Sequence, residues 1–377
     1  MCYLPNLHNS YSLLLIFIAR KDYESFGKEL GSILMDSTKI RNMEEFAAFS
    51  GVSRPTVSRF FHDPDSVRSV TREKLERALD KCDYRPNIFA INQNRKLTKN
   101  LGIVVPYLAD PFFAEIARRI ETLVIAAGYR PILLSSHGDP CLESENLDSL
   151  RSIKPAGVLL APLGRSSDIS AIEKFCLDVP TVLFDSNIEG VGDAFVGHDN
   201  FQATSVMIEY LTRTGEPPVF FEMRDPPNPN AGKRRKAYVE AMNKKELEQQ
   251  IIQIDGDGWQ LEEIGYRGAV KAINGKELSR STVFCSNDRL AIGFLTAAYE
   301  LGVKVGLAPD CDLRVAAHDN HPVSHFTCPR LTTISHNFAA IAQKSVDTIM
   351  ALIESGERSQ ERTTTLFDGE LIMRASA

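Results

Sequence analysis

The sequence predicts a small all-α module followed by a larger α/β region that forms two lobes with doubly wound parallel sheets. Two observations lead to this fold class. Residues 42–82 hold three short stretches with the hydrophobic spacing of helices, whereas from residue 100 onward strand-like apolar runs alternate with amphipathic helices. Because residues 100–377 exceed what one doubly wound sheet needs, we expect two lobes there.

Charge is unevenly distributed along the 377 residues, whose net charge is −6. Residues 36–99 carry 13 Lys and Arg against 9 Asp and Glu, whereas residues 100–377 carry 27 against 37. A basic module on an acidic body would attract a phosphate backbone at one end only. The 7 cysteines are scattered and form no C-x-x-C, which argues against a disulfide framework or a zinc site and fits a reducing cytoplasm.

The first residues fit neither part of the predicted fold. The run "YSLLLIFIAR" is too short to span a bilayer, and no Lys or Arg precedes it as in a secretory signal. We expect residues 1–37 to be an irregular extension. A start codon assigned too early, with Met35 as the true initiator, would also explain this stretch. In either case we expect a cytoplasmic protein that does not contact a membrane.

Residues 42–61 have the pattern of two short helices joined by a tight turn. Asn42 is a candidate N-cap of the first helix, and Gly51 can end it by adopting a positive φ. Ser53 is a candidate N-cap of the second helix, and Pro55 lies in its first turn, where proline is tolerated. A third helix would follow, capped by Ser69 or Thr71 and packed through an apolar stripe.

The second helix would have one apolar and one polar side. Val57 and Phe60 or Phe61 would pack against the first helix. A recognition helix needs short polar and Arg side chains on its other side, near its start, where they reach base edges. The residues that meet this need are Arg54, Thr56, Ser58 and Arg59. We therefore expect residues 38–85 to form a helix-turn-helix DNA-binding domain, with an unrelated three-helix bundle as the alternative.

Residues 86–99 are polar and basic, with Arg95, Lys96 and Lys99 close together. A segment of this kind is typical of a hinge that becomes ordered on DNA and reaches the minor groove. A solvated basic linker is the alternative.

Expected strands and helices alternate along the α/β region. Strands are expected within residues 101–108, 130–136, 156–162, 180–186, 193–199, 217–223, 281–287 and 312–320. Helices are expected within residues 111–129, 142–153, 168–176, 200–212, 232–245 and 288–302.

Polar or aromatic residues follow several of these strands, at the sheet edge where open α/β sheets bind ligands. Asp, Asn and Arg side chains can bind paired hydroxyl groups, and an aromatic ring can cover the apolar face of a sugar. The residues concerned are Tyr107 with Phe112 and Phe113, Ser135–Ser136, Asp185–Asn187, Ser286–Asp288 and His318–Asn320. The sequence thus predicts a carbohydrate site between the lobes.

Several of these stretches occur together, in the same order, in one known family. The most specific is "GVSRPTVSR" followed by "TREKLERALDKCDYRPN"; "LGIVVPYLADPFFAEIARRIE", "VFCSNDRLAIGFLTAAYELGVKV" and "DNHPVSHFTCPRLTTISHN" come after it. Residues from about 40 to 377 resemble the LacI/GalR (lactose repressor/galactose repressor) family of bacterial transcriptional regulators. The resemblance implies a hinge helix over residues 86–99 and a two-lobed, periplasmic-binding-protein-like domain for effector binding and dimerisation over residues 100–377.

The resemblance also implies a function and partners. The protein would repress carbohydrate-utilisation genes, and a sugar or sugar derivative would control its affinity for double-stranded operator DNA through an allosteric change. Release of a repressor by its effector is favoured over co-repression. The chain would act as a homodimer, with a tetramer left open, and would need no cofactor.

By the same resemblance, DNA contacts come from the second helix and the hinge. The helix residues are Ser53, Arg54, Pro55, Thr56, Ser58 and Arg59, of which Arg54, Pro55 and Arg59 fall at base-reading positions. The hinge residues are Asn87, Ile91 and Gln93. Gln93 stands where the family has a Leu that wedges between base pairs, and an amide cannot act as an apolar wedge. The central kink of the operator is therefore in doubt, or a neighbouring residue supplies the wedge.

Effector contacts in the first lobe are implied at three positions. Phe113 falls where an aromatic ring often stacks on the effector, and Phe112 precedes it. Asp185 falls near a hydroxyl-binding carboxylate that follows the fourth strand.

Further contacts are implied in the second lobe. Arg234 matches the Arg of the family motif R-x-x-G-[FW]. If the motif is aligned one residue later, Arg235 takes this place instead. Asn287 and Asp319 match polar effector contacts.

Two other classes of protein are the alternatives. A transport-type sugar-binding protein would share the lobes but would need a signal peptide and would lack "GVSRPTVSR". A nucleotide-dependent dehydrogenase would need a glycine fingerprint after the first strand, and "VVPYLADPFF" contains no glycine. No P-loop, G-x-S-x-G or H-E-x-x-H occurs either, so we expect neither catalytic residues nor metal ligands.

Overall fold

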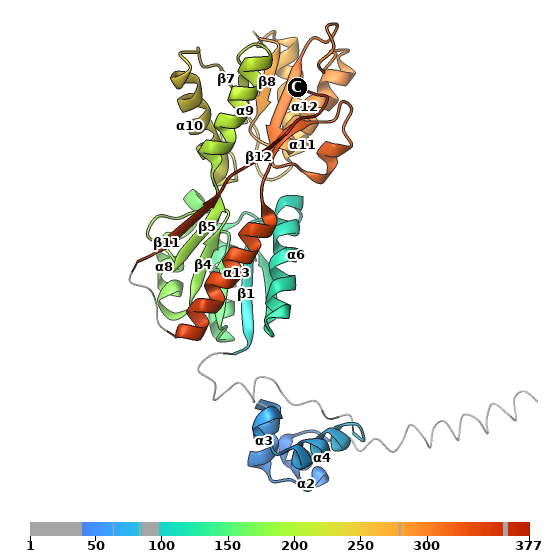
Figure 1. Cartoon of the computed structure of the whole chain (residues 1–377), viewed down its shortest axis with the longest axis vertical. Coiled ribbons are helices and arrows are strands. Elements are labelled where there is room, and N and C mark those ends of the chain that lie inside the picture. Colours follow the sequence, from blue (N-terminus) through green and yellow to red (C-terminus); the bar gives the residue numbers. More distant parts are fainter. Residues whose placement is uncertain (1–39, 63, 83, 85–97, 279, 357–360) are drawn as a thin grey trace, which may run out of the picture. The chain divides into compact units, whose positions relative to one another are not determined.

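The computed structural model describes residues 40–62, 64–82, 84, 98–278, 280–356 and 361–377. By its internal contacts the chain divides into two compact units, residues 1–96 and 97–377. Figure 1 shows the described helices of the first unit in blue and those of the second in cyan to red. The expected extension, residues 1–37, and the expected hinge up to residue 97 lie outside the described residues.

The described residues of the first unit form three α-helices that share one apolar core. They are α2 (Met43–Ser50), α3 (Arg54–His62) and α4 (Ser69–Leu79), with a short 3₁₀ helix, η1 (Pro64–Ser66), between the last two. Phe46, Val57 and Leu75, one from each helix, are fully buried in this core. The predicted pair of short helices is confirmed, as is the third helix that packs on them.

Local signals determine the ends of α2 but not the start of α4. Asn42 accepts a hydrogen bond from the backbone N–H three residues later (2.8 Å), as an N-cap does. Gly51 ends the helix with a φ of 61°, in the left-handed region. Both were predicted. The expectation that Ser69 or Thr71 caps α4 is wrong, because the helix begins at Ser69 and the cap falls on Arg68, which makes no side-chain capping bond.

Lobe 1 of the second unit is a six-stranded sheet with helices on both faces. Its strands lie in the order β11-β5-β4-β3-β1-β2, and every neighbouring pair is parallel. The strands are β1 (Asn100–Val105), β2 (Arg130–Ser135), β3 (Gly157–Leu160), β4 (Thr181–Phe184), β5 (Ala194–His198) and β11 (Thr363–Phe367). Apolar clusters place α6 (Pro111–Ala126) and α13 (Phe338–Ser355) on one face, and α7 (Pro140–Ser152) and α8 (Ile169–Asp178) on the other.

Lobe 2 repeats this plan with one difference. Its strands lie in the order β12-β10-β9-β8-β6-β7, and β12 is antiparallel to β10, whereas the other pairs are parallel as predicted. The strands are β6 (Val219–Met223), β7 (Ile251–Ile254), β8 (Thr282–Cys285), β9 (Arg314–His318), β10 (Thr332–Ser335) and β12 (Glu370–Ile372). One face is covered by α9 (Asn200–Thr214) and α10 (Pro229–Lys244), and the other by α11 (Leu261–Asn274) and α12 (Asp288–Glu300).

The chain passes between the two lobes at the ends of three strands. It crosses after β5 to enter α9, after β10 to enter α13, and between β11 and β12. These crossings place the carboxyl ends of β5 and β10 at the junction of the lobes, where Figure 1 shows the connecting segments. In the described part of the chain, every helix is too short or too polar to traverse a bilayer.

Candidate functional site

The expected recognition helix presents its polar residues on one exposed side. Val57 and Phe60 of α3 are buried in the core of the first unit. The opposite side carries the predicted contact residues: Arg54, Pro55, Ser58 and Arg59 are exposed, and Thr56 is half-buried. Ser53 precedes the helix, and its hydroxyl lies 2.9 Å from that of Thr56. The structure thus brings these six residues together along the first turns of α3.

The three predicted hinge contacts, Asn87, Ile91 and Gln93, lie outside the described residues. The prediction about an altered minor-groove wedge therefore stays a prediction.

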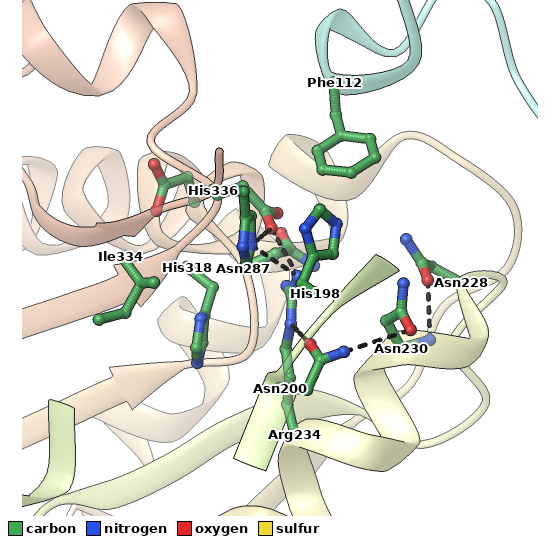
Figure 2. A network of polar contacts seen from close by, with 12 residues as sticks. Phe112, His198, Asn200, Asn228, Asn230, Arg234, Asn287, His318, Ile334 and His336 are labelled. Atoms are coloured by element: carbon green, nitrogen blue, oxygen red, sulfur yellow. Dashed lines mark hydrogen bonds and ion pairs between the residues drawn. The ribbon is translucent and has the colours of Figure 1, made fainter. Parts of the chain in front are cut away.

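Arg234 is the centre of a buried polar network between the lobes, shown in Figure 2. Its Nη2 donates to Asp319 Oδ1 at 2.6 Å, and its Nη1 donates to the carbonyl oxygen of Ser286 at 2.8 Å. Its Nε donates to Asn200 Oδ1 at 3.1 Å. Arg235 instead forms an ion pair with Glu222 at 3.2 Å. Of the two candidate arginines, Arg234 is therefore the one that joins this network.

Asp185 extends the network into lobe 1. It follows β4 and accepts hydrogen bonds at Oδ1 from Asn230 Nδ2 (3.0 Å) and from the ring Nε2 of His198 (3.0 Å). Asp185 and Asp319 have positive φ values of 61° and 107°, conformations that side-chain-bearing residues rarely adopt and that often occur at functional sites. We call the connected set the interlobe network; it comprises Asp185, His198, Asn200, Asn230, Arg234, Asp319 and His336.

Burial and neighbouring charges shift pKa values in the interlobe network. Burial opposes the charged form of Asp319, but Arg234 and His336 outweigh it and hold the pKa of this carboxyl well below its usual range. Burial, with contributions from His198 and Arg234, lowers the pKa of His336 to about 4. Near neutral pH the network therefore contains a charged Asp319–Arg234 pair beside a neutral imidazole, which together offer donors and acceptors for hydroxyl groups.

Aromatic rings cover the lobe 1 side of this region. The Phe112 ring lies edge-on to His198 and Phe338, with ring centroids 5.5 and 5.1 Å apart. Phe113 is almost fully buried and points into the core of lobe 1, where its ring lies edge-on to Trp259 at 6.0 Å. Of the two neighbouring aromatic residues, Phe112 is therefore the one next to the network.

A cavity of about 420 Å³ lies between the lobes and has walls from both. Among the predicted effector residues, Phe112 and Asp319 line it, and Arg234 lies behind Asp319. Asn287 caps α12 by accepting the backbone N–H of Leu290 at 2.9 Å, and neither it nor Asp185 lines the cavity. The other lining residues include Arg119, Arg289, Asn320, His321, His336 and Phe338. We call this the interlobe cavity.

The sequence analysis missed several residues of this region. His198 ends β5 and His336 follows β10, so the strand-end pattern used elsewhere could have found both. Arg289 is the second residue of α12, and its Nη1 donates to Asp110 Oδ2 of lobe 1 at 3.0 Å. Trp259 belongs to a loop of lobe 2, and its ring stacks on Tyr107 of lobe 1 at 5.2 Å. No periodic or strand-end signal marks the last two.

Comparison with known families finds two matches at separate parts of the chain. Residues 42–87 match the model of bacterial regulatory proteins of the lacI family, and residues 209–377 match that of the periplasmic binding protein-like domain. Among curated proteins, the NTD biosynthesis operon regulator NtdR of Bacillus subtilis is 28% identical over 334 residues, which cover 89% of this chain and 99% of NtdR. The transcriptional regulator GntR of Escherichia coli is 28% identical over 78% of this chain and 86% of its own length.

Solved structures show where this fold has been observed. A Lac repressor dimer bound to operator and the anti-inducer ONPF has a TM-score of 0.76 at 22% identity, covering 90% of this chain and 99% of that one. The transcriptional regulator CelR in complex with cellobiose has a TM-score of 0.60 at 21% identity, and the match covers 90% of this chain and 100% of the CelR chain. The segment of the first unit that matches the lacI model contains α2, α3 and α4, and the second unit has the fold of these regulators. The two matched segments and the curated relatives together support the LacI/GalR family of bacterial regulatory proteins for this chain.

Proposed function

We propose that this chain, a DNA-binding transcriptional regulator by its family, represses carbohydrate-utilisation genes under the control of a sugar or sugar derivative. The observation that carries the proposal is the interlobe network, which joins residues of both lobes beside a cavity of about 420 Å³. A ligand in that cavity would contact both lobes at once. It would therefore change the free energy of any rearrangement of one lobe relative to the other.

The DNA-binding half of the proposal rests on α3. Its exposed side carries Arg54 and Arg59, two side chains that can donate to base edges in the major groove. A recognition helix uses residues at its N-terminal end for this purpose, and Arg54 is the first residue of α3. The Lac repressor structure with operator is a dimer, and we propose that two copies of this chain likewise bind two half-sites.

The effector half of the proposal rests on the chemistry of the cavity wall. Phe112 and Phe338 supply aromatic surface, and Asp319, Asn320 and His336 supply polar groups. This combination suits a ligand with an apolar ring face and several hydroxyl groups. Structures of similar fold include a LacI family regulator with bound ribose and the regulator CelR in complex with cellobiose. These complexes support a carbohydrate as the ligand here.

The two halves are linked through the conformation of the lobes. The effector would change operator affinity only by as much as its own affinity differs between the two conformations. We favour release of a repressor by its effector over co-repression. Because operator DNA is the proposed partner, we place the protein in the cytoplasm and assign it no catalytic activity.

Two measurements on the full chain test this function. Selection of bound duplexes from a random library should return a pseudo-palindromic site, and binding to that site should weaken steeply as salt is raised, because cationic side chains displace counterions. A thermal-shift screen with sugars, sugar phosphates and polyols should find a ligand that raises the melting midpoint. A chain that selects no sequence would disprove DNA recognition, and a carbohydrate-specific stabilisation without DNA selection would favour a transport-type binding protein instead.

A further inference from the structure

An exposed ion pair joins the recognition helix to the helix before it. Arg54 Nε lies 2.6 Å from Glu44 Oε1, and both side chains are exposed, at 65% and 62%. Arg54 is the first residue of α3, and Glu44 is the second residue of α2. The pair therefore lies at the end of the recognition helix that points toward base edges in helix-turn-helix proteins.

Glu44 is the acidic residue in this turn of α2 that remains available for Arg54. The neighbouring Glu45 binds the N-terminus of its own helix: its carboxylate accepts from the Arg41 backbone N–H at 2.8 Å and from Asn42 Nδ2 at 2.9 Å. Glu45 thus belongs to the capping arrangement of α2, and Glu44 is directed across to α3. The two adjacent carboxylates have different roles.

The choice of nitrogen matters for what Arg54 can still bind. A guanidinium group has five N–H donors, and the Glu44 carboxylate approaches this group at its Nε edge. The terminal Nη1 and Nη2 groups remain, and their parallel N–H bonds match the O6 and N7 acceptors of guanine in the major groove. A carboxylate on Nε also fixes the plane of the guanidinium, so less rotamer freedom is lost when the base is bound.

We propose that Glu44 is a positioning residue for base recognition: it orients Arg54 so that the operator must carry a guanine at the base pair Arg54 faces. The inference rests on the proposed function, since it requires sequence-specific DNA binding. Pro55, the next residue, has no side-chain hydrogen-bond donor. Of these two neighbouring residues, Arg54 is therefore the one that can donate a side-chain hydrogen bond to a base.

A purely structural role for the pair would have different consequences. Exposed ion pairs add little to folding stability because water and salt screen them. A carboxylate near DNA also repels phosphate groups, so Glu44 lowers affinity for duplexes in general. Glu44→Gln should therefore weaken discrimination between bases while leaving affinity for non-specific duplex unchanged or higher. Lost stability would instead reduce binding to all duplexes alike.

The chain offers a matched control on another helix. Glu73 and Arg77 of α4 form an ion pair at 3.0 Å, with side chains 60% and 72% exposed. Glu73→Gln removes the same charge and the same kind of pair from the same unit. Any effect of net charge alone will appear in both variants, whereas an effect on Arg54 will appear only in Glu44→Gln.

The experiment uses the full chain and the duplex selected from a random library. Affinities are measured by fluorescence anisotropy for that duplex, for duplexes with the guanine replaced by each other base, and for an unrelated duplex. Arg54→Ala identifies the base pair that Arg54 reads, as the position where guanine preference disappears. Glu44→Gln should reduce the preference at that position by about fivefold or more. Glu73→Gln should leave it unchanged.

Each result bears on the inference. A Glu44→Gln variant that keeps the full guanine preference would overturn it, as would an Arg54→Ala variant that loses no base preference anywhere. A uniform loss of affinity in Glu44→Gln, accompanied by faster hydrogen exchange in α2 and α3, would show a folding role and also overturn it. A wild-type chain that selects no sequence would overturn the proposed function, and this inference with it.

Discussion

Arg234 is a buried cation whose hydrogen bonds reach three separate segments of the second unit. Its side chain is 4% exposed, and its partners are Asp319, the Ser286 carbonyl and Asn200. Removing one member of a buried pair leaves the other charge without compensation, which costs more than the pair itself contributes. The residue therefore has a structural role as well as a proposed role at the effector site.

The buried pair leads to a prediction for Arg234, and the proposed effector site leads to one for Asp319. Arg234→Ala should lower the free energy of unfolding of the second unit by about 3–5 kcal/mol, because the buried Asp319 carboxylate loses its cation.

Asp319→Ala should abolish the response to effector while leaving operator binding intact. Urea denaturation and effector-dependent anisotropy on operator DNA measure the two effects.

The control for this prediction is an exposed ion pair in the same lobe. Arg224 and Asp255 lie 3.0 Å apart with side chains 55% and 70% exposed. Arg224→Ala should change stability by less than about 1 kcal/mol. An Arg234→Ala variant as stable as Arg224→Ala would contradict the account of Arg234 as a compensated buried charge.

His336 makes stability depend on pH, with a sign that follows from its lowered pKa. In the folded chain this pKa is about 4, whereas an unfolded histidine titrates near 6.5. Between these values the unfolded chain binds a proton that the folded chain does not. The contribution of His336 to stability is therefore complete above about pH 6.5 and declines as the pH falls toward 4.

The test compares His336→Gln with wild type by urea denaturation at several pH values. The variant should lose less stability than wild type on going from pH 7 to about pH 4.5. The comparison is needed because Asp288 works in the opposite direction: burial raises its pKa to about 7, which favours the folded state at lower pH in both proteins. Parallel pH profiles for the two proteins would rule out His336 as a titrating group.

At the scale of elements, the turn between α2 and α3 requires glycine. Gly51 has a φ of 61°, and its carbonyl oxygen accepts from Lys74 Nζ of α4 at 3.1 Å. A Cβ at this position would lie 3.3 Å from that same nitrogen. The positive φ therefore opposes a residue with a Cβ, whereas the flexible end of the Lys74 side chain can move aside.

Gly51→Ala should destabilise the first unit by about 1–2 kcal/mol, the cost of a left-handed conformation for a residue with a Cβ. Hydrogen exchange at α2 and α3 in the full chain measures this change without a need to isolate the unit. Gly51→Asn is the matched variant, because asparagine tolerates this conformation better than alanine does. Equal exchange rates in both variants would mean that φ does not determine the substitution cost.

Elements defined by local signals could be predicted from the sequence. The ends of α2, the apolar side of α3 and the strand–helix alternation up to α12 depend on spacing and capping within a few residues. No local pattern in the sequence predicted β7, α11, β10, α13, β11 or β12. The two last strands are short, half-exposed and paired with strands distant in sequence: Thr363 pairs with Ala194, and Ile372 with Thr333. Such pairing has no local signature.

The candidate site shows the same limit. Strand-end polarity located Asp185 and Asp319, and the family motif located Arg234. The sequence could not show that Phe112 rather than Phe113 faces the network, because the two differ by one helical step. It also could not reveal Arg289 and Trp259, whose roles arise only when α12 and a loop of lobe 2 meet lobe 1.

At the scale of the second unit, two contacts hold the lobes together at the cavity. Arg289 of α12 donates to Asp110, the N-cap residue of α6, at 3.0 Å, and both side chains are largely buried. Trp259 is 6% exposed, and its ring is within 8° of parallel to that of Tyr107. It is the single tryptophan of the chain. Its fluorescence therefore reports on the junction of the lobes.

Asp110→Asn should weaken this junction by about 1.5–3 kcal/mol, because the charged acceptor for Arg289 is lost. Conformations with separated lobes would then gain population and expose Trp259 to water. We expect tryptophan emission to shift to longer wavelength in the variant. A ligand that prefers the closed lobes should bind the variant more weakly and restore the wild-type emission, since it selects the less populated conformation.

The control is Arg267→Gln, which removes an exposed ion pair with Glu263 on α11 of lobe 2, the lobe that contains Arg289. This variant should show wild-type emission and wild-type ligand affinity, because both side chains of that pair are exposed and screened by solvent. If Asp110→Asn also kept wild-type emission below the urea unfolding transition, the Asp110–Arg289 pair would not hold the lobes together. The conformational equilibrium that links effector to operator would then depend on the Trp259–Tyr107 stack and the interlobe network.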